Sequence, residues 1–302
     1  MMVQDNTLEK SNELLNDYNG KNPIVRVIDK ENGGHGSTIN KGIELATGKY
    51  FRLMDGDDYY LTENLDKLME HLKNEDSDIV LSNYIEDFAI TAVYNPCRFY
   101  PNLTPGAVYD MDNMYYNGNE YGFIMFGPLL PTSTYKTEVL KNANFKIDEH
   151  CFYVDMEYNL IGYINAKTVS YYPLDIYNYY LGRQGQSISK ESYKKNIKHH
   201  EKVCLRIVDE YTKQEAKLSV SKQNYLKNCI IVPMCKRQYE LTTELFKDNK
   251  NFVSFEKQFK KYESFYNNPA IAGRKVKLHR KTNGHLIWMS GFINKISKLI
   301  RR

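Results

Sequence analysis

Apolar residues in the first third of the chain recur with the spacings of helices and strands in alternation. Ile39, Ile43 and Ala46 form one stripe of a helix, and Gly48 ends it. The predicted elements are a helix over 7–18, a strand over 24–28, the helix that carries this stripe, a short strand that ends at Met54, a helix over 61–72 and a strand over 78–82. This order is typical of an α/β domain.

The apolar pattern changes after residue 84. Aromatic, Gly, Pro and Asn residues predict an irregular region over 84–131. Beyond it the pattern predicts a helix over 135–142, strands around 169–180, and charged helices from 190 to about 267. We therefore expect an α/β domain over 1–189 and a helical C-terminal region over 190–302.

Three carboxylates follow the short strand within four positions: Asp55, Asp57 and Asp58. Carboxylates this close repel one another unless a cation or several hydrogen-bond donors neutralise them. Mg²⁺ and Mn²⁺ take oxygen ligands of this kind, and ligands of α/β sheets bind at the carboxyl ends of strands. The alternative interpretation is a solvated acidic turn.

Other glycine-loop motifs do not fit the sequence before this cluster. The Gly34-x-Gly36 pair is followed by Ile39 where a dinucleotide-binding fingerprint needs glycine, and no glycine loop leads into Gly-Lys-Ser/Thr. A calcium loop that starts at Asp55 would place Tyr60 where the sharp turn needs glycine.

The run from Asn32 to Asp58 resembles family 2 glycosyltransferases. The positions that match the family pattern are Asn32, Gly33, Gly34, Asn40, Gly42, Ile43, Ala46, Gly48, Lys49, Tyr50, Leu53, Asp55, Asp57 and Asp58. The resemblance implies a GT-A-like (Rossmann-like) nucleotide-sugar-binding domain. It also implies that Asn32, Gly33, Asn40 and the three carboxylates contact the donor. Asp55 and Asp57 would hold Mn²⁺ or Mg²⁺, with Asp57 as the direct ligand.

Two later segments extend the resemblance. Asp155 takes the position of the family's catalytic base, although Val154 replaces the usual Glu before it. An inverting transfer needs such a carboxylate to remove the proton of the attacking hydroxyl. Arg183 and Ser187 lie in a segment that in relatives closes over the diphosphate. The alternatives are that Asp155 only satisfies a helix N-terminus and that Arg183 pairs with a structural carboxylate.

Two departures from the family pattern affect the expected function. Ile39 stands where the family has an arginine, and His35 or Lys41 are the candidates to replace that arginine. The first strand–helix–strand unit of the family has no counterpart apart from Asp5-Asn6-Thr7, so we expect an N-terminally truncated domain.

The main expectation is an inverting, metal-assisted transferase of surface polysaccharide synthesis. It would use a nucleoside-diphosphate sugar, a UDP-sugar in the first instance, and a glycan or lipid-linked acceptor. The alternative is a non-catalytic remnant or partner-binding subunit that holds no nucleotide.

Composition and charge limit the expected cellular compartment and the class of partner. The five cysteines are odd in number and form no Cys-x-x-Cys pair, which is typical of reduced thiols in a cytoplasmic protein. The net charge is +4, yet nine Lys or Arg and no acid lie between Arg274 and Arg302. The remainder of the chain is therefore acidic, and no nucleic-acid partner is expected.

The basic C-terminus also carries an amphipathic pattern. Apolar residues over 286–302 share one helical stripe, with Trp288 beside its start and basic residues outside it. Such a helix suits peripheral contact with the inner face of the cell membrane, where anionic lipid attracts its cations. The alternative is that this stripe docks on the protein's own core.

Overall fold

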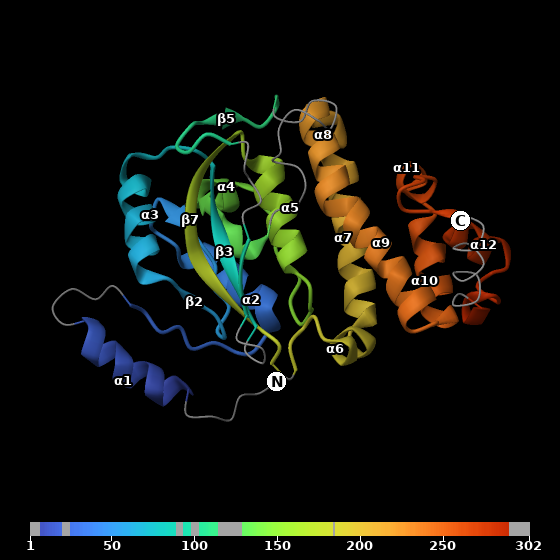
Figure 1. Cartoon of the computed structure of the whole chain (residues 1–302), viewed down its shortest axis with the longest axis horizontal. Coiled ribbons are helices and arrows are strands. Elements are labelled where there is room, and N and C mark those ends of the chain that lie inside the picture. The colour runs from blue at the N-terminus through green and yellow to red at the C-terminus, as the bar shows by residue number, and fades with distance from the viewer. Residues whose placement is uncertain are drawn as a thin grey trace.

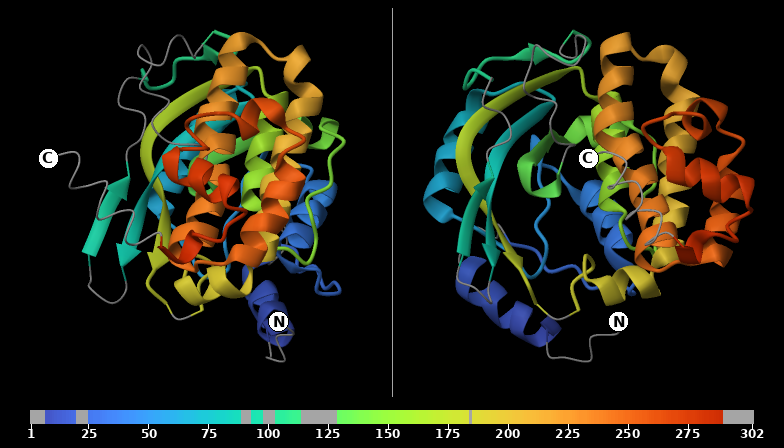
Figure 2. Two further views of the ribbon diagram at one scale, coloured as in Figure 1. Left: turned by 90° about the vertical axis from the view of Figure 1, so that its right-hand side faces the viewer. Right: turned by 45° about the vertical axis from the view of Figure 1, so that its right-hand side comes forward.

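A mixed β-sheet with helices on both faces forms the N-terminal part of the molecule (Figures 1 and 2). The computed structural model describes residues 7–19, 25–88, 93–97, 103–113, 129–183 and 185–289. The strands are β1 (Tyr50–Phe51), β2 (Tyr59–Tyr60), β3 (Ile79–Phe88), β4 (Val93–Cys97), β5 (Tyr109–Asp110), β6 (Ser133–Lys136) and β7 (Thr168–Leu181). The helices of this part are α1 (Thr7–Asn19), α2 (Gly34–Leu45), α3 (Thr62–Asn74), the 3-10 turn η2 (Leu130–Thr132), α4 (Thr137–Asn142) and α5 (Asp155–Asn165).

The parallel pair of β3 and β7 forms the centre of the sheet, whose strand order is β1-β6-β3-β7-β2. The register of this pair shifts between Leu81 and Tyr84, which marks a bulge. β4 extends the sheet beside the second half of β3, and β5 pairs with the start of β7. The β3 side chains alternate, because Val80 packs with Leu68 of α3 whereas Ile79 and Leu81 join the large core on the other face.

The described residues of the second half are mainly helical (Figure 1). The helices are α6 (Lys190–Lys195), α7 (Ile197–Gln214), η3 (Glu215–Lys217), α8 (Val220–Leu226), α9 (Val232–Tyr239), α10 (Asn249–Phe259), α11 (Glu263–Tyr266), α12 (Arg274–Lys281) and η6 (Ile287–Met289). Of these, α7 and α8 pack against α5. Two π-helical segments, η4 (Lys227–Ile231) and η5 (Glu240–Leu245), flank α9. Pro233 lacks the N–H that would bond back one turn, which accounts for the π segment just before it.

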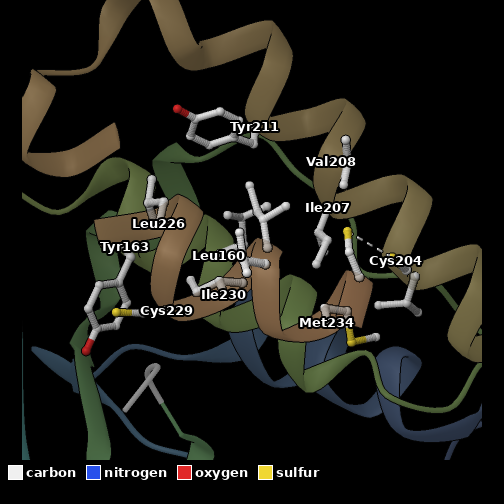
Figure 3. Close-up of a cluster of buried hydrophobic side chains, with 14 of the residues drawn as sticks. Leu160, Tyr163, Cys204, Ile207, Val208, Tyr211, Leu226, Cys229, Ile230 and Met234 are labelled. Atoms are coloured by element: carbon white, nitrogen blue, oxygen red, sulfur yellow. Dashed lines mark hydrogen bonds between the residues drawn. The ribbon is translucent and has the colours of Figure 1, made fainter. Parts of the chain in front are cut away.

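One continuous hydrophobic core joins the α5 side of the sheet to these helices. Figure 3 shows Leu160 of α5 among Ile207, Leu226 and Ile230, all of them 0–1% exposed. The five cysteines are buried and form no disulfide with one another, and the Sγ atoms of Cys204 and Cys235 lie 3.5 Å apart between α7 and α9.

Most of the helices and strands expected from the pattern are present. The helices predicted over 7–18 and 61–72 are α1 and α3, the stripe of Ile39 lies on α2, and the strands around 169–180 are the single strand β7. The mixed α/β class and the helical C-terminal part are confirmed. Helices of that part continue past the predicted end near 267, as far as α12.

Three local predictions are wrong. Residues 25–33 form no strand, because an apolar run becomes a strand only where a neighbour pairs with it. The strand expected over 78–82 continues to Phe88 and pairs with β4, so part of 84–131 is regular sheet. The helix expected to begin at Tyr135 begins at Thr137, because Tyr135 is a fully buried strand residue paired with Phe51 and Ile79.

Most of the C-terminal amphipathic segment lies outside the described residues, which end at 289. Within them, Ile287 is buried in the core and Trp288 is 68% exposed. Among the described helices, none is both long and apolar enough to cross a membrane.

Packing of α5 on β6 depends on Gly162. A Cβ atom there would overlap the ring of Tyr135, which is fully buried and donates a hydrogen bond to Asn159 Oδ1 at 3.1 Å.

Gly162→Ala gains about 1 kcal/mol of helix propensity, but overpacking costs roughly 1–3 kcal/mol. We expect a net destabilisation because the ring has no room to move, measured as a lower urea midpoint at unchanged m-value. Gly273→Ala is the control, since a Cβ there meets nothing within 4 Å. Equal stability of the two variants would contradict this account.

Candidate functional site

The acidic segment after β1 is a tight turn fixed to strand β7. The Asp58 N–H donates to the Asp55 carbonyl at 3.1 Å, and β2 then pairs with β7 through Tyr60 and Tyr177. The fully buried Tyr177 hydroxyl accepts the Asp55 N–H at 3.1 Å and donates to Asp58 Oδ2 at 2.5 Å. One hydroxyl therefore orders both ends of the acidic turn.

Asp58 is the structural member of the three carboxylates. It is 8% exposed, and its second oxygen accepts the Tyr180 N–H at 2.9 Å. Burial raises the pKa of Asp58, whereas the hydrogen bonds from Tyr177 and Tyr180 act in the opposite direction. With both oxygens engaged by the protein, Asp58 serves to hold the turn.

Asp55 and Asp57 remain more open to solvent than Asp58. Ligand atoms of the three carboxylates lie within 4.8 Å of one another, and the pattern of hard oxygens suits Mg²⁺ or Mn²⁺. His35 Nε2 is 3.4 Å from Asp55 Oδ1, and Arg183 forms an ion pair with Asp57. The donor set fits a divalent cation at Asp55 and Asp57, and Arg183 is positioned to neutralise part of the charge on Asp57.

Asp155 is the first residue of α5. Burial raises the pKa of its carboxyl group; the nearby His35 lowers it, Asp55 raises it again, and the backbone N–H groups of Asp155 and Met156 lower it. The carboxylate is thus placed beside both the acidic turn and His35.

Close packing of α2 against the loop before α5 brings these groups together. A Cβ at Gly36 would overlap the Asp148 carbonyl, so only glycine allows this approach. The Gly33 carbonyl accepts the His150 N–H at 2.6 Å, and Asn32 Oδ1 accepts the N–H of Gly34, whose φ is +76°. His35 and His150 consequently face the same space.

A cavity of about 1000 Å³ collects five of the predicted site residues: Asn32, Asp55, Asp57, Asp155 and Ser187. Arg183 reaches it through its ion pair with Asp57. Gly33 supports its wall through the backbone. Asn40 lies elsewhere: its amide bonds both the N–H and the carbonyl of Ile147 at 2.9 Å. The donor contacts assigned to these residues stay predictions.

Residues 186–188 form one rim of the cavity. Gly182 and Gly185 both have φ of +90°, and Gln186 ties the segment down by accepting the Gly182 N–H at 2.9 Å and donating to the Tyr180 carbonyl at 2.6 Å. The Ser187 carbonyl accepts a hydrogen bond from the Tyr153 hydroxyl at 3.3 Å.

Sequence reasoning missed the wall that the C-terminal helices supply. Tyr193 of α6, His200 of α7, and Met234 and Arg237 of α9 line the cavity together with Tyr153. These residues lie beyond the stretch that resembles the family, and their spacing is that of ordinary amphipathic helices. The high tyrosine content and the proline in α9 were the only sequence features that could have pointed to this wall.

Replacing Tyr177 by Phe tests the role of its hydroxyl. The change leaves buried Asp58 without one donor, which costs roughly 1–3 kcal/mol. It also raises the already elevated pKa of Asp58 further. A carboxyl whose pKa is higher folded than unfolded loses stability as pH rises through the folded pKa. We therefore expect the loss in Tyr177→Phe, measured by urea unfolding, to be larger at pH 7.5 than at pH 4.5.

The matched control for that measurement is Tyr211→Phe, which removes another buried hydroxyl, bonded at 3.2 Å to Glu215 outside the cavity. If both variants showed the same pH dependence, the special coupling of Tyr177 to the acidic turn would be refuted.

Comparison with known proteins agrees with this geometry. Residues 1–142 match the family model described as Glycosyl transferase family 2. The uncharacterized glycosyltransferase EpsJ of Bacillus subtilis is 28% identical over 204 residues, which cover 66% of this chain and 57% of EpsJ. Hyaluronan synthase of Pasteurella multocida is 33% identical over 101 residues, covering 33% of this chain and 8% of that protein. The chain thus spans only a little over half the length of EpsJ.

The fold has a solved counterpart. TarS of S. aureus, residues 1–349 in complex with UDP-GlcNAc, superimposes with a TM-score of 0.61 at 15% identity, covering 96% of this chain and 80% of that one. The same protein in complex with UDP gives a TM-score of 0.59. Residues 1–142 thus match the family 2 glycosyltransferases, the relatives named above are glycosyltransferases over the parts that align, and the fold is similar to that of TarS.

Proposed function

We propose that the protein transfers a sugar from a nucleoside-diphosphate sugar to a hydroxyl of a glycan or lipid-linked acceptor, with inversion at the anomeric carbon. The observation that carries this proposal is the meeting of Asp55, Asp57 and Asp155 in one cavity. Such a transfer needs two groups: carboxylates that bind a cation, and a separate carboxylate that accepts the proton of the acceptor hydroxyl.

Asp55 and Asp57 hold Mn²⁺ or Mg²⁺ in this proposal, with Asp57 as the direct ligand. The cation, when bound, stabilises negative charge on the departing diphosphate. Arg183 then exchanges Asp57 for phosphate oxygens, because its forked donors suit either partner. Ser187 on the same rim and Asn32 opposite it complete the donor contacts. The TarS complexes contain UDP-GlcNAc and UDP, which supports a UDP-sugar as the first donor to test.

Asp155 acts as the base that removes the proton from the acceptor hydroxyl. Its raised pKa makes it a better proton acceptor than an exposed carboxylate, and His35 lines the same cavity. His35 also takes the place of the missing family arginine: it lines the cavity, whereas Lys41 pairs with Glu44 at 2.7 Å on the surface, and Ile39 is buried in the core.

The two parts of the chain have different roles in this proposal. Residues 1–189 supply the donor contacts and the base, and residues 190–302 supply the remaining wall of the cavity. By analogy with its relatives we place the reaction in polysaccharide synthesis. A cytoplasmic setting, with the segment over 286–302 on the inner face of the membrane, would bring the site to a lipid-linked acceptor.

Substitution of the two kinds of carboxylate separates their roles. Asp155→Asn should lower turnover of UDP-GlcNAc with Mn²⁺ by about 10²–10⁴-fold while UDP binding is retained, since a general base contributes that much. Asp57→Ala should abolish the metal dependence of UDP binding. The readouts are UDP release for turnover and calorimetry for binding. Asp66→Asn, an exposed carboxylate of α3, is the control that should change neither.

Two results would contradict the proposal. Full turnover in both Asp57→Ala and Asp155→Asn would refute the site assignment. If the full chain bound neither UDP nor UDP-GlcNAc in the presence of Mn²⁺, the protein would instead be a non-catalytic or partner-binding member of the family.

A further inference from the structure

The wall that the C-terminal helices build contributes a cation to the cavity. Arg237 of α9 lines the cavity, and its guanidinium carbon lies 4.8 Å from the ring centre of Tyr193. Tyr193 in turn stacks on Tyr153, with centroids 5.2 Å apart and an interplanar angle of 6°. Arg237 is therefore linked, through two ring contacts, to the segment that carries Asp155.

Arginine side chains contact two different walls of the cavity. Arg183 pairs with Asp57 of the acidic turn. Arg237 contacts Tyr193 and Glu240 instead, and burial together with Arg237 lowers the pKa of His200 to about 4. A donor diphosphate at Asp57 thus has Arg183 near it, whereas Arg237 lies on the wall of the C-terminal helices.

Arg237 also retains hydrogen-bonding capacity. Its described ion pair is with Glu240, one helical turn on, at 3.3 Å, and both side chains are over 40% exposed. Such a solvated pair contributes little, so a ligand anion can replace Glu240 at small cost. The ring of Tyr193 holds the guanidinium in place and limits the entropy lost when a ligand binds.

The backbone of two residues that line the cavity is strained. Tyr153 has φ of +68°, and His150 has φ of +53°; both line the cavity. A bulky residue in this region costs roughly 1–3 kcal/mol, and such strain clusters at binding sites. The π segments η4 and η5 on both sides of α9 are a second departure from regular structure, of a kind that is frequent at functional sites.

We propose that Arg237, held by Tyr193, is the acceptor-side anchor of this cavity and selects an acceptor that carries a phosphate or carboxylate group. The inference rests on the proposed function, because it assigns the second substrate of the same site. It names the class of acceptor: an anionic glycan or a phosphate-linked one, bound with its hydroxyl toward Asp155 and its anion toward Arg237.

The test measures binding of three probes to the full chain by saturation-transfer NMR: glucose, glucuronic acid and glucose 6-phosphate, with UDP and Mg²⁺ present to occupy the donor end. At least one anionic probe should bind about 10-fold more tightly than glucose, which is the effect of one charge-assisted hydrogen bond. Comparison of the two anionic probes tells carboxylate from phosphate recognition. Arg237→Gln should erase the preference, and Arg237→Lys, which keeps the charge, should retain part of it.

Lys236→Gln is the matched control. Lys236 is an exposed cation of the same helix, and its side chain does not line the cavity. Three results would overturn the inference: no preference for an anion in the unaltered protein, loss of the preference in Lys236→Gln as well, or weaker UDP binding in Arg237→Gln, which would assign Arg237 to the donor. Calorimetry with UDP alone reports separately on the proposed function. Failure to bind UDP with the anion preference intact would refute that function and leave the anion site standing.

Discussion

The hydroxyl of Tyr177 is the interaction on which the site depends. Three carboxylates in one turn repel one another, and the chain offsets this repulsion by burying one of them against a donor from the central sheet. Because the same oxygen accepts the Asp55 N–H, the positions of Asp55 and Asp58 are set by one rigid strand. The remaining carboxylate, Asp57, pairs with Arg183.

A second constraint joins the two halves of the chain behind Asp155. Buried Asp148 pairs with Arg206 and with Lys202 of α7, and its N–H donates to Glu157 of α5 at 2.9 Å. Burial raises the pKa of Glu157 to about 7. The cluster lies between the loop of His150, the helix of Asp155 and the helix of His200. The geometry of the cavity therefore depends on both halves, since neither half contains all of its walls.

Sequence reasoning identified residues that share one cavity better than it identified the rest of the cavity wall. Asp55, Asp57, Asp155 and Ser187 were selected from short motifs, and all four line the same cavity. Arg237 was missed because it reaches the cavity through packing of α9 on α7, and packing over such separations leaves no local signal. The strand expected over 24–28 failed for a related reason: its apolar residues satisfy a pattern, but a strand is defined by its neighbours. Asn40 matched the motif, yet its amide is used to hold Ile147.

Burial of every cysteine has a practical consequence. Burial raises the pKa of Cys97, Cys151, Cys204 and Cys229, so these thiols are poorly ionised as well as covered. A maleimide reagent would find little to attack on the folded chain. A cysteine introduced on the rim over 186–188 would then carry a fluorophore or spin label at one defined place. The native thiols could stay where they are, and movement of the rim could be followed without altering the core beneath it.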